Sequence, residues 1–372
     1  MAYLDTGTGY EMFEMLSMLQ KAIRRGDYEH AGFAANQLKR KFRTAMWNRI
    51  FVISAEDCFG VITKELVKLR EEDEEKRNDL YVSEAVALLC RARKSRDACY
   101  FSCNFVLASR SPRRLKPSSE MIQRYLVIAK NGNNRNEQEF EQLSLLEDTP
   151  KQTADETENQ KKSHIGAALA LAFEHRDMDM IGYQMDLLRH HSREFLWNVF
   201  EYISRHSIAH EIKALRKADN IVNGKRSNKD EIFISKAAML ICHSQDSKFK
   251  TVLSVDFMIC DQQIDWKRFQ VKSITQCELT NGKIPDWVYD CHTFKGKKMG
   301  KTDWDMTVTE QAALCPLQYA YFDEASWLYT YEQDLENGDM TRVQMEPIWE
   351  FAKNHEVNPV DFIPYMKEEI IS

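Results

Sequence analysis

The chain has few of the residues that interrupt helices, since only 13 of its 372 residues are glycine and 8 are proline. Both are unfavourable inside helices, so their scarcity favours an all-α fold. The longest apolar runs, such as 50–53 and 165–173, are far too short to span a bilayer. Residues 1–10 lack a basic segment followed by an apolar one, so no secretory signal is expected. We therefore expect a protein without a membrane partner.

The cysteines argue against a disulfide framework. There are nine, an odd number, in a chain long enough to build a core without them. Cys90 and Cys242 stand among apolar neighbours, which favours reduced, buried thiols and a cytoplasmic, intracellular location. No cysteine or histidine group has the spacing of zinc ligands, and the adjacent Cys291 and His292 cannot readily form a catalytic dyad. We expect no metal site, no cofactor and no enzymatic activity.

Charge is distributed unevenly along the chain. Residues 303–372 contain fifteen acidic and three basic residues, whereas residues 1–302 carry a net charge of +6. A mildly basic body followed by an acidic region is a charge asymmetry that accompanies binding to polyanions. Because such an asymmetry can also serve solubility alone, both interpretations stay open.

The strongest feature of the sequence is a long-range repeat. Residues 15–27 resemble residues 165–177, and the ordered matches that follow keep an offset of 150 residues without a gap. The matched pairs are Ala22 and Ala172, Asp27 and Asp177, Leu38 and Leu188, Trp47 and Trp197, Asn48 and Asn198, and Ser54 and Ser204. Farther along, residues 83–90 match residues 235–242 at an offset of 152. We therefore predict a tandem duplication of one helical domain.

Local signals predict helices within each copy. Apolar residues at three- and four-residue steps between Met12 and Ile23 place one apolar face on a helix. Gly26 is expected to end that helix, and Asp27 to cap the next one through its carboxylate. Trp47 and Trp197 are interpreted as core anchors, with stacking on nucleic-acid bases as the alternative.

The repeat and the changes in composition divide the chain into five segments. A first helical repeat domain over 1–130 is followed by a polar linker over 131–162 and a second helical repeat domain over 163–262. Residues 263–302 form a basic, loop-rich segment, and residues 303–372 an acidic helical C-terminal region. The predicted fold class is all-α, a tandem duplicated helical domain with a helical C-terminal extension.

The sequence 295–302, Lys-Gly-Lys-Lys-Met-Gly-Lys-Thr, ends like a Walker A loop. That loop needs four residues between its glycines, but Gly296 and Gly300 are separated by three, and no apolar strand precedes them. We therefore expect a flexible basic loop rather than a nucleotide site. Its lysines suit contact with nucleic-acid phosphates, with a solvated surface loop as the alternative. They are Lys295, Lys297, Lys298 and Lys301.

A second cationic stretch covers residues 91–116, in which Asp97 is the only acid. Its basic residues are Arg91, Arg93, Lys94, Arg96, Arg110, Arg113, Arg114 and Lys116. The planar guanidinium group of arginine suits phosphate, so these residues are candidates for nucleic-acid binding. The matching stretch of the second copy lacks this charge, which favours an added function over a packing requirement. A solvated face remains the alternative.

Three motifs of the first copy occur together in a known family. Residues 20–27 and the alanine-rich segment after them resemble the "hKSvRGsDpdAAlyw" segment of the RarA/MgsA family of AAA+ ATPases. Residues 50–60 resemble its "RiASEDIG" stretch, and residues 83–95 its "EAViYLAlAPKSN" stretch. Their order and spacing are similar to those of the family's C-terminal helical oligomerisation domain, over roughly residues 9–107. No Walker motif accompanies them, so the resemblance implies oligomeric assembly and contact with DNA without motor activity.

From these observations we expect a non-catalytic accessory protein of DNA replication, repair or recombination. It is expected to form a homo-oligomer and to contact DNA, single-stranded DNA included, or a single-strand-binding protein. The alternative is a protein–protein interaction scaffold or adaptor without nucleic-acid binding, in which the acidic residues 303–372 meet a basic partner.

Overall fold

The computed structural model describes residues 3–24, 26–58, 62–92, 97–102, 106, 117–131, 158–204, 208–224, 226, 229–245, 271–290 and 292–301. These residues are mainly helical and contain no strand, which confirms the all-α prediction for the described part of the chain. The predicted helical extension over 303–372 lies outside the described residues. So does most of the predicted linker, although a helix already begins at Glu158.

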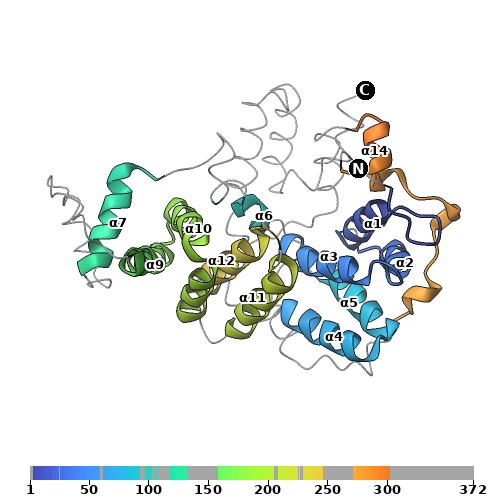
Figure 1. Ribbon diagram of the computed structural model, residues 1–372, viewed down its shortest axis with the longest axis horizontal. Helices are drawn as coiled ribbons and strands as arrows, with labels where there is room; N and C mark the ends of the chain where they lie inside the picture. The colour runs from blue at the N-terminus through green and yellow to red at the C-terminus, as the bar shows by residue number, and fades with distance from the viewer. Residues whose placement is uncertain are drawn as a thin grey trace, which may run out of the picture.

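The first block of helices lies on one side of the molecule (Figure 1). It comprises α1 (Met12–Arg24), α2 (Tyr28–Leu38), α3 (Arg43–Glu56), α4 (Thr63–Lys76) and α5 (Asp79–Arg91). The short helix α6 (Asp97–Phe101) lies nearer the middle of the picture, where it packs against α12 (Ile232–Gln245) and α3. The face of α1 that the sequence predicts to be apolar is buried, with Met15, Leu19 and Ala22 fully covered. The large burial of apolar side chains is the main source of stability for such a helical layer.

The turn between α1 and α2 shows why those helices begin and end where they do. Gly26 adopts a left-handed backbone with φ of +66°, which glycine tolerates without a side-chain clash. Its N–H donates to the carbonyl oxygen of Ile23 at 3.0 Å. The N–H of Asp27 donates to the carbonyl oxygen of Ala22 at 2.9 Å. The Asp27 carboxylate then accepts the N–H of His30 and caps α2, as the sequence predicts.

The second block contains α9 (Glu158–His175), α10 (Met178–Ile203), α11 (Ala209–Asn223) and α12 (Ile232–Gln245). The helix α10 is kinked at Ser192, whose backbone is extended. The helix α7 (Ser119–Asn131) packs against α9, and its Tyr125 hydroxyl donates to Asp177 at 3.1 Å. In Figure 1, α7 therefore lies beside the second block, although its residues belong to the predicted first domain.

The end of α9 repeats the end of α1 at an offset of 150 residues. Arg176 has a left-handed φ of +55°, and its N–H donates to the carbonyl oxygen of Phe173. The N–H of Asp177 donates to the carbonyl oxygen of Ala172 at 3.0 Å, and the Asp177 carboxylate caps α10. Both blocks thus use one pattern of hydrogen bonds to close one helix and begin the next. The duplication itself stays a prediction.

The two blocks share one apolar core, formed where α3 and α4 meet α11 and α12. Glu211 is fully buried at this junction, and its carboxylate accepts the N–H of Thr63 at 2.7 Å and that of Lys64 at 2.9 Å. Lys236 is also buried and donates to the carbonyl oxygen of Cys58. Charged groups of the second block therefore satisfy backbone groups of the first.

The segment 271–301 runs along the first block and ends near the N-terminus of the chain (Figure 1). It contains the short 3₁₀ turns η3 (Ile274–Gln276), η4 (Thr280–Gly282) and η5 (Asp286–Val288), followed by the helix α14 (Phe294–Lys298). Ile274 and Val288 are fully buried against the first block. A close contact between Cys277 and Gly32 of α2 leaves no room for a side chain at position 32.

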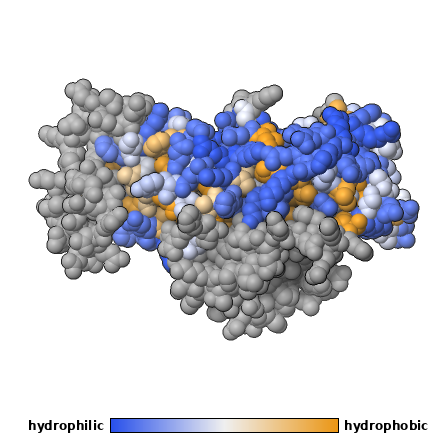
Figure 2. All heavy atoms as spheres, turned by 90° about the horizontal axis from the view of Figure 1, so that it is seen from below, coloured by the Kyte–Doolittle hydropathy of each residue, from blue (hydrophilic) through white to orange (hydrophobic). Residues whose placement is uncertain are grey.

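Hydrophilic side chains cover most of the described surface on the face seen in Figure 2, with smaller hydrophobic patches between them. Among the described helices, none combines the length and the apolar character that crossing a bilayer requires.

Candidate functional site

A buried aspartate organises charged and aromatic side chains in the first block. Asp73 on α4 accepts a hydrogen bond from Nε of Arg43 at 2.7 Å and one from Nε1 of Trp47 at 2.7 Å. Arg43 also pairs with Asp79 at 3.3 Å. The hydrogen bond and charge of Asp73 raise the pKa of Arg43, against the opposing effect of burial. This network holds α3, α4 and the start of α5 together.

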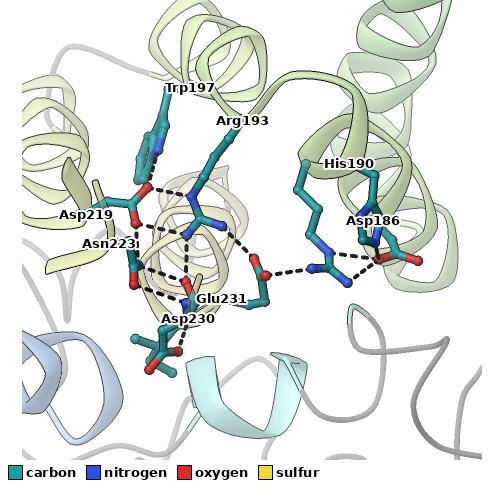
Figure 3. Close-up of polar contacts among 10 residues, drawn as sticks. Asp186, His190, Arg193, Trp197, Asp219, Asn223, Asp230 and Glu231 are labelled. Carbon is teal, nitrogen blue, oxygen red and sulfur yellow. Dashed lines mark hydrogen bonds and ion pairs between the residues drawn. The ribbon is translucent and has the colours of Figure 1, made fainter. Parts of the chain in front are cut away.

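The second block contains the same network, drawn in Figure 3. Asp219 on α11 accepts from Nε of Arg193 at 2.7 Å and from Nε1 of Trp197 at 2.7 Å. Arg193 also pairs with Glu231 at 2.7 Å, and Asn223 donates to Asp219 at 2.7 Å. Burial lowers the pKa of Arg193, but its carboxylate partners outweigh that effect and raise it.

These networks decide the role of the two tryptophans. Trp47 is 0% exposed and Trp197 is 1% exposed, so neither ring can stack on a base. Both are core anchors whose indole N–H reaches a buried acceptor. The sequence comparison missed Asp73 and Asp219 because they are 146 residues apart rather than 150.

The lysines of the predicted phosphate loop lie on a short helix rather than in a flexible loop. The hydroxyl of Thr293 accepts the N–H of Gly296 at 3.1 Å and thereby caps α14. Lys295 and Lys297 lie within α14 and Lys298 at its end, while Lys301 follows two residues after Met299. The expectation of a flexible loop was wrong because a local cap and the contacts described next order this segment.

The helix α14 is anchored to the core of the first block. Lys21 of α1 and Asp290 form a buried ion pair with an N–O distance of 2.6 Å. The backbone of Asp290 lies so close to Gly296 that a Cβ atom at position 296 would be only 2.0 Å from the Asp290 carbonyl oxygen. Ser17 donates to the carbonyl oxygen of Val288 at 2.7 Å. The lysines are therefore held on a defined surface.

The lysines of α14 differ in their contacts. Lys295 donates to the Tyr289 hydroxyl at 2.9 Å and lies 4.1 Å from the centre of that ring. The hydrogen bond raises the pKa of Lys295. Lys298 lies 4.4 Å from the centre of the Phe294 ring, and Lys297 and Lys298 are exposed. These side chains present cationic groups at the surface, and aromatic neighbours limit the motion of Lys295 and Lys298.

The second predicted cationic stretch lies largely outside the described residues. Arg91 ends α5, and nothing is described of its side chain. Arg93, Lys94, Arg96, Arg110, Arg113, Arg114 and Lys116 are not among the described residues. The candidate role of this stretch in nucleic-acid binding stays a prediction.

A cleft that the sequence analysis did not identify opens between the start of α3 and the end of α4. Its volume is about 660 Å³. It is lined by Arg40, Lys41, Phe42, Arg43, Thr44, Ala45, Asn48, Arg70, Asp73, Glu74 and Arg77. The lining contains more cationic than anionic side chains, which suits an anionic ligand.

Two further observations concern catalysis and metals. In the described part of the chain, no cluster of three or more His, Cys, Asp or Glu side chains is arranged to hold a metal ion. Burial raises the pKa of Cys277 to about 11 and raises that of Cys242 further, so neither thiol is activated as a nucleophile.

Comparison with known proteins returned no match among family models, curated proteins or solved structures. The resemblance to the RarA/MgsA family therefore stays an expectation that the sequence motifs carry.

Proposed function

We propose that this protein is a non-catalytic nucleic-acid-binding protein that serves as an accessory factor in DNA replication, repair or recombination. The observation that carries the proposal is the set of exposed lysines on α14, anchored to the core by the Lys21–Asp290 ion pair. Lysines fixed on a rigid element lose less entropy on binding phosphates than lysines on a loop.

The charge of the chain agrees with this proposal. Residues 1–302 carry a net charge of +6, and Lys297 and Lys298 are exposed among them. Lysine ammonium groups bind nucleic-acid phosphates as point charges and release condensed counterions, which drives binding at low salt. The stretch 91–116 adds further cationic residues to this chain.

The motifs similar to the RarA/MgsA helical domain support DNA as the nucleic acid and a homo-oligomer as the assembly. A helical scaffold without catalytic machinery would then act by positioning DNA or a single-strand-binding protein. Size-exclusion chromatography with light scattering, run with and without DNA, tests the assembly.

The test of nucleic-acid binding uses the double variant Lys297→Glu/Lys298→Glu. We expect affinity for a poly-dT oligonucleotide to fall by about tenfold or more, and the slope of log affinity against log salt to fall by roughly one to two. Fluorescence anisotropy at several ionic strengths measures both quantities. The control variant is Lys213→Glu/Lys229→Glu, which makes the same change of charge at exposed lysines outside α14.

If the control weakens binding as much as the α14 variant, the assignment to α14 is wrong. If the unchanged protein binds neither single- nor double-stranded DNA at low salt, the proposal of nucleic-acid binding is wrong. The alternative of a protein–protein interaction adaptor would then be the one to test.

A further inference from the structure

The cleft between α3 and α4 places a helix N-terminus beside cationic side chains. Phe42, Arg43, Thr44 and Ala45 line it, and they are the N-cap and the first three residues of the 14-residue helix α3. Phe42 provides no side-chain cap, and the first turn of α3 contains no acidic residue. The partial positive charge of the helix start is therefore exposed to the cleft.

The amide groups of this first turn are available to a ligand. The first backbone hydrogen bond of the helix runs from the N–H of Met46 to the carbonyl oxygen of Phe42 at 2.8 Å. Within the described residues, the N–H groups of Arg43, Thr44 and Ala45 donate to no backbone or side-chain acceptor. Such groups at a helix start form a ready site for an anion.

The side chains of the cleft add positive charge that is not neutralised. Both carboxylates in the lining have partners, because Asp73 pairs with Arg43 and Glu74 pairs with Arg70 at 2.6 Å. The Nε atom of Arg70 is buried and has no hydrogen-bond partner in the described structure. The side chains of Arg40 and Arg77 are exposed and form no ion pair with any described residue.

The corresponding helix start in the second block is capped by a side chain. Ser192 lies 150 residues after Phe42, and its hydroxyl accepts the N–H of Phe195 at 3.1 Å. His190 and His191 stand where the first block has Arg40 and Lys41. Four residues after the network aspartate, the second block has Asn223, which bonds to Asp219, whereas the first has Arg77.

The two blocks share the Asp–Arg–Trp network but differ at the start of the helix that carries the tryptophan. Both blocks keep the buried aspartate, arginine and tryptophan, so the network alone is enough to build the fold. Only the first block leaves the helix start uncapped and surrounds it with cations. The fold therefore does not require the uncapped, cationic helix start of the first block.

We infer that the cleft binds a phosphate group through the free amides at the start of α3 and the side chains of Arg40, Lys41 and Arg77. The volume of about 660 Å³ exceeds that of one phosphate and lies within the range of pockets for small ligands. The phosphate can therefore belong to a free anion or to a nucleic-acid backbone. This site is separate from the lysines of α14.

The N-terminal segment contacts both cationic surfaces. On the side of the cleft, Nζ of Lys41 donates to the carbonyl oxygen of Asp5 at 3.4 Å. Tyr3 packs edge to face against Phe294 of α14, with ring centres 6.4 Å apart. Residues 3–5 thus contact both Lys41 of the cleft and Phe294 of α14.

The test uses Thr44, an exposed residue of the cleft in the first turn of α3. The substitution Thr44→Glu places a carboxylate among the free amides and beside the cations, where it competes with the ligand. A carboxylate in the first turn also favours the helix, so the thermal midpoint should stay unchanged or rise. The matched control, Thr44→Gln, has nearly the same shape without the charge.

The probes are inorganic phosphate and a poly-dT oligonucleotide, each titrated into the full chain by calorimetry. We expect Thr44→Glu to weaken phosphate binding by about tenfold or more without loss of thermal stability. Thr44→Gln should keep most of the affinity for phosphate. A double variant Arg40→Glu/Arg77→Glu should weaken binding as strongly. If poly-dT displaces phosphate, the ligand is a backbone phosphate; if it does not, the ligand is a free anion.

Two results would overturn the inference. One is equal affinity of the unchanged protein and Thr44→Glu for phosphate. The other is the absence of heat from either probe at low ionic strength. If Lys297→Glu/Lys298→Glu loses poly-dT binding but keeps phosphate binding, the inference about the cleft still holds. The proposal for α14 and the inference about the cleft can therefore fail independently.

Discussion

At the residue scale, the buried aspartates Asp73 and Asp219 organise the two blocks. Each accepts a tryptophan N–H and an arginine N–H at 2.7 Å, and each is almost completely buried. A buried carboxylate is costly unless its charge is paired and its oxygens accept hydrogen bonds. Here both conditions hold, so these contacts select one packing of the helices around each tryptophan.

We predict that Asp219→Asn destabilises the protein strongly. The change removes one of the two carboxylate partners of the buried Arg193 and leaves only Glu231. Breaking a buried pair costs about 3–5 kcal/mol. Denaturation with urea measures the free energy of unfolding. The control is Glu72→Gln, which removes an exposed ion pair to Lys76 on one helix and should cost less than about 1 kcal/mol. Similar losses for the two variants would contradict this account.

At the element scale, the segment 271–301 depends on a few long-range contacts with α1 and α2. It contains only short 3₁₀ turns and α14 among its described residues, so local helix formation contributes little to its stability. Asp290 lies at its centre. This carboxylate pairs with Lys21 and also accepts the N–H groups of His292 at 2.8 Å and Thr293 at 3.1 Å.

The Lys21–Asp290 pair predicts a dependence of stability on pH. Burial raises the pKa of Asp290, but the hydrogen bond and charge of Lys21 outweigh it and lower the pKa below the ordinary value of 3.8. The folded state then binds this proton more weakly than the unfolded state does. The stabilisation is therefore present above pH 3.8 and is lost as the pH falls through the folded pKa.

We predict that Asp290→Asn lowers the free energy of unfolding at neutral pH by about 3–5 kcal/mol, because the buried ammonium group of Lys21 loses the Asp290 carboxylate. The difference from the unchanged protein should shrink as the pH falls below the ordinary carboxyl range. Urea denaturation at neutral and acidic pH measures it. A difference that stays constant or grows in acid would show that this pair does not titrate as described.

At the scale of the whole molecule, the two blocks are joined by more than apolar contact. Glu211 of α11 accepts the first two amide groups of α4, in the way that a capping side chain does, but from the other block. Burial raises the pKa of Glu211, while the hydrogen bonds from Lys64 and Thr63 and the charge of Lys236 act in the opposite direction. The start of α4 thus depends on the presence of the second block.

We predict that Glu211→Ala destabilises the junction of the blocks by about 2–5 kcal/mol, since one buried and one part-buried amide lose their acceptor. The control is Glu71→Ala, which removes an exposed ion pair to Lys217 between the same two helices and should cost about 0–1 kcal/mol. The free energy of unfolding from urea denaturation compares them. Equal effects would mean that the buried carboxylate does not hold the blocks together.

Signals that act over a few residues were readable in the sequence. The apolar steps of α1, the left-handed glycine at position 26 and the Asp27 cap depend on neighbours within one or two helical turns. The tryptophans at positions 47 and 197 could be interpreted as core anchors because large aromatic side chains are buried wherever a core can take them.

Contacts between distant residues were decided only by the folded chain. Thr63 and Glu211 are 148 residues apart, and Lys21 and Asp290 are 269 apart, so no local pattern relates them. The cleft exists because the end of α4 packs beside the start of α3, which brings Arg77 to the uncapped turn at Thr44. Helical periodicity is a property of neighbours along the chain, whereas a binding surface depends on which helices share a core.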